Sequence, residues 1–112
     1  MVAGRTAESA ACDYLCQQGL KLLERNYHGR QGEIDLIMED AGTLVFVEVK
    51  YRSRSEFGDA AAFVTVSKQQ RLIATANRYL QRYRQPPRCR FDVIAMNGQT
   101  GIDWIRNAFD SH

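Results

Sequence analysis

The chain is 112 residues long, with 45% apolar and 25% charged residues. These proportions exclude a disordered chain and a coiled coil, and the length has room for one hydrophobic core. We therefore expect residues 1–112 to form a single domain. The formal net charge of +2 does not by itself indicate a partner.

No apolar run approaches the roughly 18 residues that a membrane-spanning helix needs, and the N-terminus carries no apolar signal segment. We expect a cytoplasmic protein that has no membrane partner. In that compartment Cys12, Cys16 and Cys89 are expected to stay free thiols. Cys12 and Cys16 could share a metal on one helix, but zinc needs further ligands, so buried packing is the favoured interpretation.

The first predicted element is a helix over Thr6–Gln18, capped by Thr6 and ended by Gly19. Glu8 precedes Ala11 and Cys12 by about one helical turn, so its carboxylate is in line with the apolar stripe that should face the core. Interaction of a first-turn acid with the helix dipole is the simplest explanation.

Three extended segments follow, Leu20–Tyr27, Glu33–Glu39 and Thr43–Tyr51, separated by short glycine-containing turns. They predict an antiparallel meander. The third segment alternates between two faces, with Leu44, Phe46, Glu48 and Lys50 on one and Val45, Val47 and Val49 on the other. Because both faces are largely apolar, this strand is expected to be central.

The second half of the chain predicts one helix and two strands. Residues Arg52–Val66 lack periodicity and are expected to form a loop at the sheet edge or at the mouth of a site. A helix should begin at Ser67, with Gln70 at the capping-box position. Strands are expected at Cys89–Met96 and Ile102–Ile105, before an irregular tail. A strand, a long helix and another strand predict a parallel crossover, so we expect an α/β fold with a mixed central β-sheet flanked by helices.

Two acids and a lysine lie on neighbouring predicted strands, Asp35 on one and Glu48 and Lys50 on the next. Burying such charges costs several kcal/mol per ion unless they pair or bind a metal. Asp35, Glu48 and the backbone carbonyl of Val49 offer the oxygen ligands that Mg²⁺ or Mn²⁺ takes, and Lys50 can then orient an attacking hydroxide or neutralise charge on a phosphodiester. The alternative is an ion pair of Lys50 with either acid, because the tripeptide Glu-x-Lys is common.

Three segments resemble the YraN family of small bacterial proteins: Gly32-Glu33-Ile34-Asp35-Leu36-Ile37, Leu44-Val45-Phe46-Val47-Glu48-Val49-Lys50 and Arg90-Phe91-Asp92-Val93-Ile94. The resemblance covers nearly the whole chain. Members of that family look like nucleases of the PD-(D/E)xK superfamily, so the resemblance implies a restriction-endonuclease-like core similar to that of Holliday-junction resolvases. Tyr51 departs from the pattern, which favours a small residue after the lysine.

Carried over by position, the resemblance implies that Asp35, Glu48 and Lys50 are the metal-binding and catalytic residues. It also implies that Glu8 is a further metal ligand or positions the other ligands, and this interpretation is now favoured over the helix dipole. Asp92 is expected to be structural and to pair with an arginine near the end of the sheet.

Nucleic acid, with DNA favoured, is the partner that the resemblance implies. Arg52 and Arg54 follow the expected site directly, Arg71 and Arg78 lie along one side of the second helix, and Gln70 is a weaker candidate beside them. Basic helices are more often merely solvated, so both interpretations of this helix stay open.

The sequence thus predicts a Mg²⁺-dependent nuclease that acts on structured or branched DNA by metal-assisted phosphodiester hydrolysis. The alternative is a nucleic-acid-binding or partner-binding module that has the nuclease fold without productive cleavage. Resolvase-like relatives often form dimers, so a homodimer is implied by analogy alone.

Overall fold

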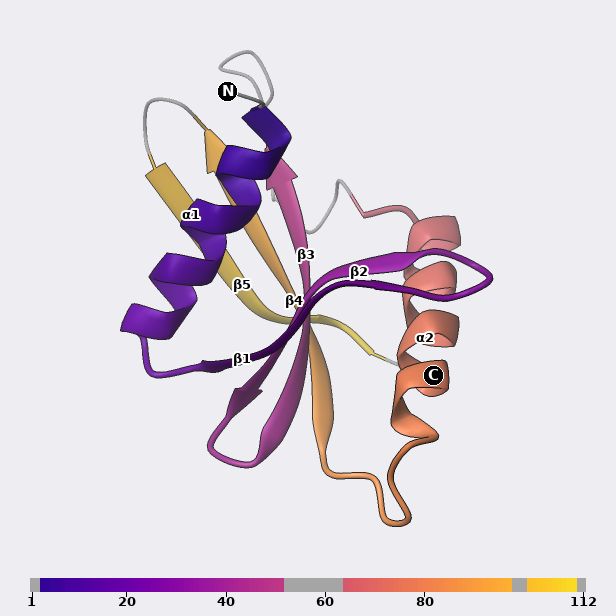
Figure 1. Cartoon of the computed structure of the whole chain (residues 1–112). Helices are drawn as coiled ribbons and strands as arrows, with labels where there is room; N and C mark the ends of the chain where they lie inside the picture. Colours follow the sequence, from indigo (N-terminus) through magenta and orange to yellow (C-terminus); the bar gives the residue numbers. More distant parts are fainter. Residues whose placement is uncertain (1–2, 52–63, 98–100, 111–112) are drawn as a thin grey trace.

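A computed structural model describes residues 3–51, 64–97 and 101–110 (Figure 1). Arg52, Arg54 and most of the expected loop lie outside these residues. The described elements, in chain order, are α1 (Ala3–Gln17), β1 (Lys21–His28), β2 (Glu33–Asp40), β3 (Thr43–Tyr51), α2 (Val66–Leu80), β4 (Cys89–Asn97) and β5 (Gly101–Phe109).

The strands form one five-stranded sheet in the order β1-β2-β3-β4-β5. β3 and β4 are parallel, whereas the other neighbouring pairs are antiparallel. This arrangement confirms the predicted meander of β1 to β3 and the mixed α/β sheet. β3 is the central strand, and its residues Val45 and Val47 are fully buried.

The two helices cover opposite faces of the sheet, as Figure 1 shows. Leu15 of α1 belongs to the core that includes Val47, and Leu72 of α2 belongs to the core that includes Phe46. The predicted alternation along β3 is therefore confirmed. Each fully buried side chain of this size contributes roughly 1.5–3 kcal/mol, so β3 anchors both layers. Neither helix of the described residues is long and apolar enough to cross a membrane.

The end of α1 is confirmed and its start is not. Gly19 has a positive φ of 102°, its N–H donates to the carbonyl of Cys16 at 3.0 Å, and the N–H of Leu20 donates to the carbonyl of Leu15 at 3.1 Å. These bonds satisfy carbonyls that the helix end would leave free. The helix begins at Ala3, so the prediction that Thr6 caps it was wrong. Arg5 and Ala7, on either side of Thr6, have high helix propensity and favour continuing the helix.

The cap of α2 also differs from the prediction. Thr65 is extended, and its side-chain oxygen accepts the N–H of Lys68 at 3.1 Å. The helix therefore begins at Val66, and Ser67 lies inside its first turn. The predicted capping box with Gln70 was wrong, because the cap stands two residues earlier in the sequence and Lys68 occupies the third helical position.

β5 runs to Phe109, so the predicted irregular tail after Ile105 was wrong. Asn107 adopts a left-handed φ of 51°, and the pairing of β4 with β5 shifts register between Phe91 and Val93. Asparagine tolerates this conformation better than most residues. Phe109 then stacks on Phe91 with ring centroids 4.9 Å apart, and this contact holds the end of the strand.

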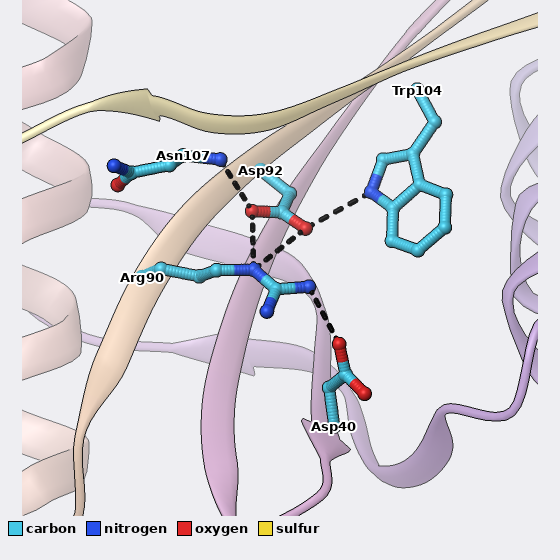
Figure 2. Close-up of polar contacts among 5 residues, drawn as sticks. All are labelled: Asp40, Arg90, Asp92, Trp104 and Asn107. Carbon is cyan, nitrogen blue, oxygen red and sulfur yellow. Dashed lines mark hydrogen bonds and ion pairs between the residues drawn. The ribbon is translucent and has the colours of Figure 1, made fainter.

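Asp92 is fully buried at the centre of a polar network, drawn in Figure 2. Its two oxygens accept hydrogen bonds from Arg90 Nε at 3.0 and 3.2 Å, from Trp104 Nε1 at 2.9 Å and from the backbone N–H of Asn107 at 2.9 Å. Arg90 Nη2 also donates to Asp40 at 3.0 Å. The prediction that Asp92 is structural and pairs with an arginine is consistent with this network, which ties β2, β4 and β5 together.

The cysteines are free thiols, and two of them differ in burial along α1. Cys12 is 7% exposed and packs in the core on that face, which confirms the packing interpretation for this residue. Cys16 is exposed, so the same interpretation was wrong for Cys16, one turn further along the helix.

Candidate active site

β2 and β3 separate at one end of their pairing, where Asp35 and Glu48 lie. The last pair in register is Leu36 with Val47. Beyond it, β2 continues to pair with β1, and β3 continues to pair with β4. In Figure 1 the β1–β2 hairpin reaches across toward α2 while β3 runs away from it. Asp35 and Glu48 are the first residues beyond this point, which we call the fork.

Asp35 bridges the fork. Its Oδ2 accepts the backbone N–H of Val49 at 2.8 Å, so a side chain satisfies an amide that no longer pairs with β2. Burial, and then the negative charge of Glu48, together raise the pKa of Asp35 to about 7, although the Val49 hydrogen bond lowers it. A carboxyl group with such a pKa is held beside a second carboxylate at a cost that a bound cation would remove.

Glu48 is 6% exposed and points to the face that α2 covers, because its Oε2 lies 3.5 Å from Nζ of Lys68. The alternative considered from the sequence was an ion pair of Lys50 with one of the acids. The ion pair that Glu48 forms is with Lys68 instead. Since one end of this pair is partly exposed, a cation of higher charge can compete with Lys68 for Glu48.

Lys50 stands two residues after Glu48 on β3 and is partly buried. The confirmed alternation puts both side chains on the same face of the sheet. Within the part of the chain that the structure describes, Lys50 forms no ion pair with an acidic side chain. Its ammonium group is therefore available to a ligand at the fork.

Glu8 reaches the site from α1. Burial raises the pKa of Glu8, and the carboxylates of Asp35 and Glu33 raise it further, while Arg25 and a hydrogen bond with Asn26 lower it. Glu8 on α1 is therefore close enough to Asp35 on β2 for the charge of Asp35 to affect it. The structure brings Glu8, Asp35 and Glu48 to the same end of the sheet.

The donor set at the fork suits a hard divalent cation, since carboxylate and carbonyl oxygens are the ligands such ions take. Asp35 and Glu48 supply adjoining carboxyl groups, and the carbonyl of Val49 is the further oxygen that the sequence predicts. Among residues 3–51, 64–97 and 101–110, no three or more His, Cys, Asp and Glu side chains form a group able to hold a metal in this arrangement. Within those residues Glu8 is not grouped with Asp35 and Glu48 as a third metal ligand.

The raised pKa of Asp35 predicts how stability depends on pH. The folded pKa of about 7 lies above the ordinary value of 3.8, so the folded state keeps a proton that the unfolded state releases. The contribution of Asp35 to stability is then largest at low pH and falls as pH rises from about 4 to about 7, with a limiting slope near 1.4 kcal/mol per pH unit.

The measurement is urea unfolding of the metal-free protein and of Asp35→Asn, in which the amide oxygen can still accept the Val49 N–H. The free energy of unfolding of the wild type should fall relative to the variant between pH 4 and 7 and then stay parallel to it. A difference that is constant over this range contradicts the assignment.

Of the other predicted site residues, Arg52 and Arg54 lie outside the described residues, whereas Arg71 and Arg78 lie at the β1–β2 hairpin. Gln70 is exposed on α2, and so are Arg71 and Arg78. Arg71 donates to the hydroxyl of Ser67 at 3.1 Å, and its Cβ lies 3.8 Å from the position a Cβ would take on Gly32. These arginines border the tip of the β1–β2 hairpin, not the acid pair.

Lys68 lies at the fork, although the sequence pattern predicted no role for it in the site. The sequence shows only that a lysine stands in the first turn of α2, three residues after the cap Thr65. The contact with Glu48 could not be read from the sequence, since it depends on how α2 crosses β3. The neighbouring Gln69 donates its side-chain amide to the carbonyl of Val64 at 2.9 Å and thereby fixes the start of the helix.

The fold and the fork define the class of protein: an α/β domain whose mixed sheet carries adjoining carboxyl groups where two strands separate. The family described as "Uncharacterised protein family UPF0102" matches residues 7–96, from α1 to β4. The chain belongs to this family, which is also called YraN.

Similar proteins occur in several bacteria. A UPF0102 protein of Janthinobacterium sp. (strain Marseille) is 53% identical over 110 residues, covering 98% of this chain and 89% of the relative. One from Herminiimonas arsenicoxydans is 52% identical over 110 residues, covering 98% and 88%. One from Coxiella burnetii is 48% identical over 109 residues, covering 96% and 91%. Their names state the family and no activity.

Proposed function

We propose that this protein is a Mg²⁺-dependent nuclease that hydrolyses phosphodiester bonds in branched or otherwise structured DNA, with Mn²⁺ able to replace Mg²⁺. The observation that carries the proposal is the acid pair at the fork. Asp35 has a pKa raised to about 7 by burial and by Glu48, which is itself 6% exposed. The resemblance to the PD-(D/E)xK nucleases supports the same reading of these residues.

The chain's own residues would divide the work. Asp35 and Glu48 would hold the ion through their carboxylates, together with the carbonyl of Val49. Lys50 would orient the attacking water and offset negative charge on the scissile phosphate. Glu8 would accept a hydrogen bond from a water of the site and so orient it.

A bound Mg²⁺ supplies a water of lowered pKa and offsets the charge that develops on the phosphate oxygens. For the residues, this requires that Asp35 lose its proton and that Glu48 exchange Lys68 for the ion. The exchange at Glu48 is available, because the Glu48–Lys68 distance is 3.5 Å and the Lys68 side chain is 35% exposed.

Calorimetric titration with Mn²⁺ tests the ligand assignment. Glu48→Gln is expected to weaken Mn²⁺ binding by at least tenfold, because it removes a ligand charge. Glu33→Gln is the matched control, since Glu33 lies on β2 two residues from Asp35 but pairs with His28 at 3.0 Å and has a side chain 45% exposed. Equal loss in the two variants contradicts the placement of the site.

One observation favours a second candidate function, a nucleic-acid-binding module that does not cleave. Lys68 already offsets the charge of Glu48, as it would in a permanent ion-pair network. In that case Lys68→Ala destabilises the protein and leaves it unable to bind Mn²⁺. In the nuclease, Lys68→Ala removes a competitor and Mn²⁺ binding becomes tighter.

A further inference from the structure

A small hollow lies between the tip of the β1–β2 hairpin and the outer surface of α2. Its volume is about 160 Å³, and it is lined by Arg30, Gln31, Ala74, Thr75 and Arg78. Its cationic side chains come from two different elements, one arginine from the turn and one from the helix. This hollow is separate from the acid pair at the fork.

The hairpin is held firmly against the helix. A Cβ on Gly29 would lie 3.3 Å from Arg78 Cδ and 3.3 Å from Thr75 Cγ2, so the turn packs closely against α2 and a larger residue would require these side chains to shift. Next to the turn, Tyr27 near the end of β1 meets Tyr79 of α2 edge to face, with centroids 5.2 Å apart. The walls of the hollow are therefore fixed by packing before any ligand arrives.

The groups that line the hollow suit an anion. Arg30 and Arg78 are exposed guanidinium groups that can each donate two hydrogen bonds to one phosphate. The backbone N–H groups of Arg30 and Gln31 donate to no acceptor within the described residues, so they are also free to bind. Thr75 cannot add a donor, because its hydroxyl already donates to the carbonyl of Arg71 at 2.8 Å.

We propose that this hollow binds a backbone phosphate of the DNA, several nucleotides from the phosphate that is cleaved. The proposal rests on the proposed nuclease function and adds a second point of contact. Arg30 precedes Asp35 by five residues, or at most roughly 18 Å of extended chain. A DNA strand rises 3.4 Å per nucleotide, so one strand spans both places with about five nucleotides at most.

The experiment measures binding of a fluorescent four-way DNA junction by anisotropy, in EDTA, at several salt concentrations. The double variant Arg30→Gln/Arg78→Gln is compared with the wild type. Each lost phosphate contact lowers the slope of log K against log [salt] by about 1. We expect a slope lower by about 1 to 2 and an affinity lower by about tenfold or more at the lowest salt.

The matched control removes the same charge elsewhere, in Arg88→Gln/Arg106→Gln. Both residues are exposed and lie away from the hollow. The carbonyl of Arg88 accepts the N–H of Leu44, which places Arg88 next to the turn at the opposite end of β2. Arg106 lies on β5, at the edge of the sheet. The control should keep the slope within about 0.5 of the wild-type value. An equal loss in both doubles means that net charge, not the hollow, binds DNA, and it overturns the proposal.

Neutral methylphosphonates placed one at a time along a strand locate the contact. In the wild type, one position within about five nucleotides of the cleaved bond should weaken binding, and the double variant should be insensitive there. Two results overturn the inference. One is unchanged DNA binding in the double variant, and the other is inorganic phosphate that competes for the hollow without changing the slope of log K for DNA against log [salt]. A wild type that never cleaves but shows the expected binding differences disproves the nuclease and leaves the hollow as a DNA site.

Discussion

Replacing Lys50 with alanine is expected to lower the rate of DNA cleavage by about 10²–10³-fold, while Mn²⁺ affinity changes by less than about threefold. The reason is that a positioned cation acts on charge that develops during the reaction, and removal of one such group costs rates of this size. Lys50 shares a face with Glu48 but forms no ion pair with an acid of the described residues, so its loss should not unfold the sheet. The measurement is single-turnover cleavage of a labelled four-way junction.

Two further variants serve as controls for this measurement. Lys21→Ala removes an exposed lysine where β1 pairs with Glu39, at the far end of β2 from the fork, and should leave the rate unchanged. Asp35→Asn should abolish both cleavage and Mn²⁺ binding. A Lys50→Ala protein that cleaves at the wild-type rate would remove Lys50 from the mechanism, whatever the metal does.

The largest effect on stability is expected at Asp92. Asp92→Ala should lower the free energy of unfolding by about 3–5 kcal/mol, because it leaves a partly buried guanidinium and two further donors without their fully buried acceptor. These groups are Arg90, whose side chain is 19% exposed, the indole N–H of Trp104 and the backbone N–H of Asn107 (Figure 2). Urea unfolding with the linear extrapolation measures the change.

Asp40 provides the control for this variant. It contacts the same arginine at 3.0 Å, but its side chain is 30% exposed, so Asp40→Ala should cost about 1 kcal/mol or less. If Asp92→Ala costs no more than Asp40→Ala, the network contributes little, and the order of β2, β4 and β5 depends on apolar packing instead.

Local sequence patterns were enough to predict the sheet. The alternation in Thr43–Tyr51 identified a strand buried on both faces, and the turn at Ala41 and Gly42 has the positive φ values, 50° and 90°, that a tight hairpin needs. Gly19 marked the end of α1 for the same conformational reason. These features are encoded by residues that are neighbours in the chain.

The parts that could not be predicted depend on contacts between distant residues. Nothing in the sequence indicates that pairing of β2 with β3 ends at Leu36, yet this end creates the fork. β5 continues to Phe109 because Asn107 donates to Asp92, which lies on another strand. The predicted cap of α2 was two residues too late, because Thr65 and Ser67 are both good capping residues. Val66, which lies between them, is 68% exposed and does not belong to the buried face of the helix.

The candidate site was predicted in part for related reasons. Asp35, Glu48 and Val49 meet because two predicted strands are neighbours, which the hairpin spacing already implied. The resemblance linked Glu8 to the site, and in the structure the charge of Asp35 helps to raise the pKa of Glu8. The ion pair with Lys68 needed the three-dimensional arrangement of α2, and so did the hollow at the hairpin tip.

The most direct test of the central claim is cleavage by the wild-type protein, with Mg²⁺ or with EDTA, of four DNAs: a four-way junction, a flap, a linear duplex and a single strand. The acid pair at the fork predicts cleavage that requires the metal, is fastest on the junction or the flap, and is lost in Asp35→Asn. Absence of cleavage on all four DNAs, or cleavage that survives in both Asp35→Asn and Lys50→Ala, contradicts a nuclease built on Asp35, Glu48 and Lys50.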